Sequence, residues 1–288
     1  MSFIIDEKPQ THLEVDPYDH DVMSGDSDSE VPPAYDDAFS KAPSTVQLQI
    51  HAVGYDYGQA LTGNTLENIA VDRVETGELA YTSVRLSRSS NSCALVRGHD
   101  TSRSLISTIY RWGPGRPPRM RVFAGPAGVS VDDAIHNDHL PCELVNVKSR
   151  NVFSRTQRFA TSFGTFEWRY ADRAERKQPE NNADSLLVCE RTDGGGTGSS
   201  GGKAGKRGVQ VAQLVRNEAM RTPGTTRWMG GNGGRLALDL SGWADAAAAD
   251  GKGATAAQGV EAFLVASCIC MLKREADRFK DNAIASVV

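Results

Sequence analysis

The sequence of 288 residues predicts a mainly β protein. We expect a closed antiparallel β-barrel of about twelve strands around a buried hydrophobic C-terminal helix, with a disordered N-terminal arm. Three observations support this fold class. Residues 1–44 are rich in Asp, Ser and Pro, short β-like runs begin at Thr45, and residues 262–272 form an uncharged apolar run. The chain therefore divides into an arm, 1–44, and one barrel domain, 45–288.

The arm has too few large apolar residues to offset the entropy of ordering, so we expect it to be disordered. Residues 1–40 hold eleven acids and one base, out of 36 acids and 32 bases in the chain, which leaves the remainder with an excess of bases. An acidic arm thus precedes a mildly basic body, and such a body favours anionic partners. The alternative is a solvated surface with slightly more Arg than Asp.

A PPxY sequence lies in the arm, at Pro32, Pro33 and Tyr35. Consecutive prolines favour a polyproline II segment, which WW domains bind in aromatic-lined grooves, and the tyrosine fits a second pocket. Because ubiquitin ligases with WW repeats use this motif prominently, we expect it to recruit a WW-domain protein such as a ubiquitin ligase. The alternative is an ordinary Pro-rich linker before the fold.

From Thr45 onward, short β-like runs are separated by turns, as in sandwiches and barrels. A Gly- and Pro-rich segment at 113–118 separates two of these runs and predicts a turn or hairpin loop. The runs lie at residues 46–53, 79–86, 93–97, 105–112, 120–123, 143–147, 157–161, 164–170, 185–190, 210–216 and 235–240.

The last predicted element is a helix that contains the apolar run 262–272. Glu261 suits a helix start, and Lys273 and Arg274 suit a later turn. Apolar residues occupy every face, so the helix is buried in protein or in lipid. A membrane span needs about 20 apolar residues, whereas a run of about 10–14 is typical of a core helix. Such a helix needs a closed surround, which favours a barrel over a sandwich.

A Gly-rich segment at 193–208 is predicted to be a flexible hairpin loop with a basic tip. It contains a formal GxGxxG at Gly196, Gly198 and Gly201. Dinucleotide binding requires a helix after this motif, and here a strand-like pattern follows. A Walker A sequence fails as well, because Thr197 stands where its first glycine is required. We expect no nucleotide and no other cofactor.

The sequence contains no convincing candidate for a catalytic or metal-binding site. His136 and His139 lie near Asp132, Asp133 and Asp138, but their spacing matches no zinc site, so a polar loop is predicted. No serine sits in a GxSxG nucleophile elbow, which is a strand-to-helix turn. We therefore expect no metal ion, no catalytic residue and no enzymatic activity.

Cysteine usage and the first residues predict a cytoplasmic protein, with any membrane contact peripheral. The chain has five cysteines, none at CxxC spacing, which is typical of reduced thiols. Cys268 and Cys270 fall in the apolar helix, where thiols act as packing groups. The first residues have neither the basic start nor the long apolar core of a secretory signal.

Basic side chains around the predicted strands suggest binding of an anionic membrane lipid. Neighbouring strands that bring several of them together would create a phosphate-binding face, worth about 1 kcal/mol per basic side chain at an anionic membrane. The alternative is that they are ordinary outward positions, and no recognised nucleic-acid module is present, so we expect no nucleic-acid partner. The candidates are Arg111, Arg116, Arg119, Arg121, Arg169 and Arg173.

Three segments resemble the tubby C-terminal-like superfamily, which includes LURP-one-related proteins and phospholipid scramblases, and within it uncharacterised fungal members. They are Phe-Gly-Thr-Phe-Glu-Trp-Arg-Tyr at 163–170, Leu-Leu-Val-Cys-Glu at 186–190 and Val-Ala-Ser-Cys-Ile-Cys-Met-Leu-Lys-Arg-Glu at 265–275. The resemblance covers about residues 45–285 and implies a barrel of about twelve strands around a central hydrophobic helix. Tubby domains bind phosphoinositides through basic residues, but their basic motif has no residue-by-residue match here.

These observations predict a non-enzymatic adaptor. Its PPxY arm would recruit a WW-domain protein, and its barrel would bind an anionic lipid or a protein. The alternative is a scramblase-like protein that interacts with membrane lipid, in which the arm is incidental.

Overall fold

The computed structural model describes residues 45–62, 68–85, 92–110, 117–123, 128–150, 154–179, 181–193, 208–243 and 253–286. The predicted arm, with Pro32, Pro33 and Tyr35, lies outside the described residues, as do Gly196, Gly198 and Gly201 of the Gly-rich segment. The chain divides into two units, Met1–Asp36 and Asp37–Val288, and the fold described below belongs to the second.

The second unit is built on one large antiparallel sheet, as predicted. Within the described residues, thirteen strands follow one another in the order β8-β6-β5-β4-β3-β2-β1-β14-β13-β12-β11-β10-β9, and β7 pairs with β5 outside this order. The strands are β1 Thr45–Ile50, β2 Ile69–Arg73, β3 Leu79–Val84, β4 Cys93–Arg97, β5 Asp100–Ile109, β6 Arg119–Val122, β7 Val129–Ser130, β8 Glu143–Asn146, β9 Lys148–Ser149, β10 Gln157–Thr161, β11 Gly164–Tyr170, β12 Ser185–Arg191, β13 Val209–Arg216 and β14 Arg235–Asp239.

The sheet forms a nearly closed barrel. The two end strands of this order, β8 and β9, are consecutive in the chain, with only Val147 between them. This one segment pairs with β6 through β8 and with β10 through β9, so it joins the two ends of the sheet at a seam. The carboxylate of Glu143 accepts hydrogen bonds from the backbone N–H and the hydroxyl of Ser162, at 2.6 and 2.7 Å. These bonds tie β8 to the turn between β10 and β11, on the other side of the seam.

The two strands expected on either side of the 113–118 segment pair with each other, and β10 pairs with β11 in the same way. Ile106 of β5 pairs with Val122 of β6, and Phe159 of β10 pairs with Phe166 of β11. Alternation along β11 buries Phe166 and Trp168 completely and leaves Glu167 partly exposed. In strands of this kind every second residue is buried, so one face of the sheet lies in the core. This alternation explains why the short runs in the sequence form strands.

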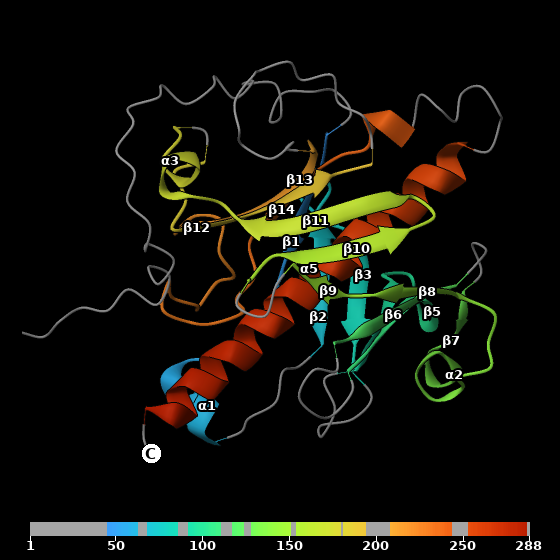
Figure 1. Cartoon of the computed structure of the whole chain (residues 1–288), viewed down its shortest axis with the longest axis horizontal. Coiled ribbons are helices and arrows are strands. Elements are labelled where there is room, and N and C mark those ends of the chain that lie inside the picture. Colours follow the sequence, from blue (N-terminus) through green and yellow to red (C-terminus); the bar gives the residue numbers. More distant parts are fainter. Residues whose placement is uncertain are drawn as a thin grey trace, which may run out of the picture. The chain divides into compact units, whose positions relative to one another are not determined.

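Helix α5, Gly253–Ala285, runs through the barrel, as Figure 1 shows in red. Residues 260–272 are all buried, which confirms the predicted core helix. The helix is longer than its apolar run, because residues 273–285 are mostly good helix formers. Among the described residues it is long and apolar enough to cross a membrane by length and composition, over Ala256–Ala285, but 78% of its most apolar window is buried in this fold.

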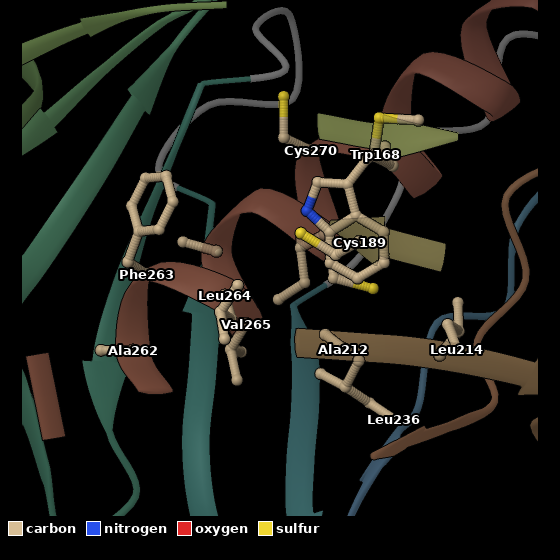
Figure 2. Packing of buried hydrophobic residues seen from close by; sticks show 14 of the residues in the cluster. Trp168, Cys189, Ala212, Leu214, Leu236, Ala262, Phe263, Leu264, Val265 and Cys270 are labelled. Atoms are coloured by element: carbon tan, nitrogen blue, oxygen red, sulfur yellow. The ribbon is translucent and has the colours of Figure 1, made fainter. Parts of the chain in front are cut away.

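Aromatic side chains fill the space between α5 and the sheet. The Phe263 ring lies 5.3 Å from the Phe166 ring and 6.1 Å from the Phe159 ring, measured between centroids. Figure 2 shows Trp168 of β11 beside Cys189 of β12, with Phe263 and Val265 of the helix in the same cluster. Offset and edge-to-face contacts of this kind add to the free energy of burying the rings.

Short helices accompany the barrel in the described part of the chain, among them α1 Tyr57–Thr62, α2 Val131–His136 and α3 Arg173–Arg176. Helix α2 corrects the polar loop predicted around His136. The side chain of Ser130 accepts a hydrogen bond from the backbone N–H of Asp133 at 3.1 Å and so caps the helix. Val131 and Ala134 are the buried residues of this helix, and Val131 packs against Ala94 and Val96 of β4.

Polar bonds fix α5 in the barrel near its start and at its middle. Glu261 accepts hydrogen bonds from Arg73 Nη2 at 2.7 Å and from the Tyr81 hydroxyl at 3.0 Å. Burial and the neighbouring Glu261 charge raise the pKa of Tyr81, so its hydroxyl keeps the proton that it donates. At the middle, Trp168 Nε1 donates to Ser267 Oγ at 2.9 Å.

A buried ion pair fixes the far end of the apolar run. Arg216 Nη1 lies 2.9 Å from Glu275 Oε2, and the Tyr170 hydroxyl donates to the same carboxylate at 3.1 Å. The Arg216 Nη1 and Nη2 groups also donate to Asn232 and Ser185. Glu275 therefore receives donors from β11 and β13 at once, which sets the depth and rotation of α5.

Loss of the Arg216 guanidinium should strongly destabilise the protein, because it leaves the Glu275 carboxylate buried without its cation. We expect Arg216→Met to lower the free energy of unfolding by about 3–5 kcal/mol, measured by urea titration of the full chain. Arg119→Met, at an exposed position of β6, should change it by less than about 0.5 kcal/mol. Equal effects of the two substitutions would contradict this role of the ion pair.

Candidate anion-binding face

The structure does not bring the six predicted arginines together. Arg111 and Arg116 lie outside the described residues. Arg119 is exposed on β6, and Arg173 is exposed at the start of α3. The strands β8, β9, β10 and β11 separate β6 from the segment that carries α3 in the order around the barrel. Arg119 and Arg173 therefore belong to different parts of the surface.

Arg121 is only 3% exposed and uses its donors inside the fold. Its Nη2 donates to the Asn137 carbonyl at 2.7 Å and its Nη1 to the Ala134 carbonyl at 3.2 Å. Its Nε contacts Cys142 Sγ at 3.4 Å. Arg121 thus binds the carbonyl groups at the C-terminal end of α2 and holds that helix on the sheet. This corrects its place among the lipid-binding candidates.

Arg169 is also committed to internal partners. Its two terminal nitrogens donate to the two oxygens of Glu175 at 2.8 Å, and Glu190 accepts from the same guanidinium at 2.8 and 3.0 Å. Burial alone would lower the Arg169 pKa, but the hydrogen bonds and charge of Glu175 and the charge of Glu190 outweigh it and raise the pKa. The side chain joins α3 to β11 and β12, so it too leaves the predicted lipid site.

The barrel register instead aligns three exposed basic side chains in a row. Arg119 of β6 lies opposite Asn146 of β8. Two residues later, on the same face of the extended chain, comes Lys148 of β9, which lies opposite Arg158 of β10. Val147 between them points into the core and is fully buried. We call Arg119, Lys148 and Arg158 the basic row, and all three are exposed.

Charges near the basic row leave it with a positive excess. Glu167 of β11 lies opposite Arg158, and Arg150 Nη1 lies 3.8 Å from Glu167 Oε1. Arg150 is itself 70% exposed. One carboxylate therefore stands among four cations. Lys148 and Arg158 face each other directly, and like charges in opposed positions of a sheet destabilise it. An anion bound between them would remove this repulsion.

Lys148 and Arg158 are not among the six arginines predicted from the sequence. Nine residues lie between them in the chain, and only the pairing of β9 with β10 brings them opposite each other. In the sequence, valine at 145 and 147 alternates with polar residues at 146 and 148, and this alternation predicts that Lys148 points outward. The structure agrees, since Val145 and Val147 are fully buried.

Other reactive groups in the described residues serve the fold. The imidazole of His136 lies 3.3 Å from the carboxylate of Asp132, within α2. No group of three or more His, Cys, Asp or Glu among the described residues could hold a metal ion. Burial raises the pKa of the Cys270 thiol to about 11 and that of Cys268 as well. These thiols stay protonated at neutral pH and act as packing groups.

Comparison with protein-family models, with curated proteins and with solved structures gives no match for this chain.

Reversing one charge of the opposed cation pair should stabilise the sheet. We expect Lys148→Glu to raise the free energy of unfolding by about 0.5 kcal/mol, because a like-charge pair becomes an opposite-charge pair. Lys148→Gln, which removes the repulsion alone, should give a smaller gain. Urea titrations at low and high salt measure both, and the gain should shrink as salt increases. A loss of stability in Lys148→Glu would show that the two side chains do not repel each other.

Proposed function

We propose that this protein is a non-enzymatic adaptor. Its PPxY motif recruits a WW-domain protein such as a ubiquitin ligase, and its barrel binds an anionic lipid headgroup through the basic row at the surface of a membrane. The observation that carries the proposal is the occupied barrel interior. Small barrels commonly hold their ligands inside, but here α5 fills that space, so binding takes place on the outer surface or through the arm.

The chemistry of the basic row suits a phosphate-bearing headgroup. Lys148 and Arg158 present one ammonium and one guanidinium from adjacent strands, and Arg119 adds a third cation along the same face. Arginine binds phosphate with paired donors, whereas lysine acts as a point charge. Each such side chain contributes about 1 kcal/mol near an anionic membrane, so three of them support reversible, peripheral binding.

The alternative, a scramblase-like protein whose helix enters the bilayer, is disfavoured by the bonds that hold α5. Glu261, Lys273 and Glu275 of this helix are buried charged side chains within the barrel. Transfer to lipid would separate Glu261 from Arg73 and Glu275 from Arg216, at about 2.5–3.5 kcal/mol per charge near the bilayer centre. The barrel would also lose the aromatic packing around Phe263. Peripheral binding needs none of these changes.

The architecture gives the proposal one further support. A barrel around a C-terminal hydrophobic helix is what the resemblance to the tubby C-terminal-like superfamily implies, and the barrel here encloses such a helix. We extend the proposal to membership of this superfamily, in a cytoplasmic protein whose membrane contact is peripheral.

The PPxY motif can be tested by titrating the full-length protein against a panel of WW domains. We expect saturable binding to at least one domain, and a loss of about tenfold or more in Tyr35→Ala, because the second pocket loses its aromatic ring. Tyr18→Ala is the matched control, since Tyr18 also follows a proline in the arm but has no PPxY around it. Binding that is absent, or that ignores Tyr35, would remove the adaptor function.

The lipid site can be tested by liposome flotation of the full-length protein at low salt. We expect retention on anionic liposomes that contain phosphoinositide, and a fall of about tenfold or more in Lys148→Glu/Arg158→Glu. Arg103→Glu/Lys177→Glu makes the same change of net charge at two exposed positions away from the row and should fall much less. Equal losses in the two double variants would show that binding depends on net charge and not on the basic row. If the unaltered protein is not retained, the lipid proposal is wrong.

A further inference from the structure

An exposed apolar side chain lies on the strand that leads into the basic row. Leu144 of β8 is 57% exposed, more than any other large hydrophobic side chain in the described part of the chain. Val145 and Val147, which follow it, are fully buried. Because alternate residues of an extended chain point to opposite sides, residues 144, 146 and 148 share the outer face of the barrel. Leu144 therefore lies on the same face as Lys148.

The strand pairings place Leu144 close to the cations of the row. Leu144 lies opposite Arg121 of β6, and Asn146 lies opposite Arg119, two residues along the same pair of strands. Strand β8 also lies beside β10, as Figure 1 shows. At about 3.3 Å per residue, Leu144 and Lys148 are separated by about 13 Å along the chain. One flat surface can therefore contact the leucine and the cations together.

The carboxylates that contact the neighbours of Leu144 are held by partners. The Glu143 carboxylate accepts hydrogen bonds from the backbone N–H and the hydroxyl of Ser162. Asp138 Oδ1 lies 3.9 Å from Arg121 Nη1. Together with the four cations and one carboxylate around the basic row, these groups make five cations and three carboxylates. The positive excess of the row is thus kept where Leu144 joins it, and it favours an anionic partner.

The combination of cations and leucine distinguishes between anionic partners. A single exposed leucine is common on protein surfaces, so its exposure alone assigns no partner. A soluble phosphate compound would bind the cations and gain nothing from Leu144. An anionic bilayer offers phosphates at its surface and acyl chains directly beneath them, so cations and an apolar side chain on one face both gain from it.

We propose that Leu144 enters an anionic bilayer at the boundary of its acyl chains while the basic row binds lipid phosphates at the bilayer surface. This inference rests on the lipid binding proposed above and adds an apolar contact to it. Long Lys and Arg side chains bend along such a surface and keep their charges among the headgroups, which lets a shorter apolar side chain reach the acyl chains. Leu144 then makes the protein bind a bilayer more tightly than it binds a free headgroup.

The test compares two ligands of the full-length protein. Liposomes that contain phosphoinositide are assayed by flotation at low salt, and soluble inositol trisphosphate is assayed by calorimetry. We expect Leu144→Ser to weaken liposome binding about fivefold, because a half-exposed leucine no longer leaves water, and to leave the affinity for inositol trisphosphate unchanged. Leu144→Trp should strengthen liposome binding, because tryptophan favours the membrane interface. A gain of this kind cannot result from loss of folding.

Val209→Ser and Val209→Trp are matched controls. Val209 of β13 is 53% exposed, and β11 and β12 separate it from β10. Both controls should bind liposomes as the unaltered protein does, and equal effects at the two positions would overturn the inference.

The basic-row variant Lys148→Glu/Arg158→Glu separates this inference from the proposal on which it rests. If that variant loses liposome binding while both Leu144 variants keep the affinity of the unaltered protein, the lipid site stands and the role of Leu144 is wrong. If Leu144→Ser weakens both ligands equally, the leucine supports the headgroup site and does not enter the bilayer. If the unaltered protein binds no liposomes, the lipid site and the inference both fail.

Discussion

Burial of α5 on all sides is the constraint on which the rest of the structure depends. A helix with apolar residues on every face cannot lie on a sheet with one side in water, so the sheet must surround it. The single-residue link between β8 and β9 and the bonds from Ser162 to Glu143 meet this need at the seam. Closure around α5 brings β8 and β9 together at the seam, and so places Lys148 of β9 next to β10.

An apolar helix inside an apolar barrel could slide or rotate, because hydrophobic contacts have little directional preference. The polar groups of Glu261, Ser267 and Glu275 remove this freedom, since each requires its own partner in a different strand or strand pair. Removing one partner leaves a buried polar group without a hydrogen bond, which costs more than the bond contributes. We infer that these groups serve the specificity of the fold more than its stability, as is known for some buried polar groups.

Local pattern was enough to predict most of the strands, the hairpin around 113–118 and the core helix, because periodicity and turn residues determine them. It missed β2 and the two-residue strands β7 and β9. It was not enough for the site. Arg119 and Arg121 are two residues apart on one face of β6 and look equivalent in the sequence, yet α2 covers Arg121 and leaves Arg119 exposed. That difference depends on where residues 131–142 fold back. Lys148 and Arg158 likewise become neighbours only through the pairing of β9 with β10.

Because α5 fills the interior of the barrel, a ligand of the barrel would bind on its outer surface. The proposed binding through the basic row would depend on charge, so it would weaken as salt screens the lipid headgroups. Lys148 and Arg158 are opposite each other only because the strands that enclose α5 bring β9 beside β10. The buried helix therefore supports the basic row without contacting a ligand there.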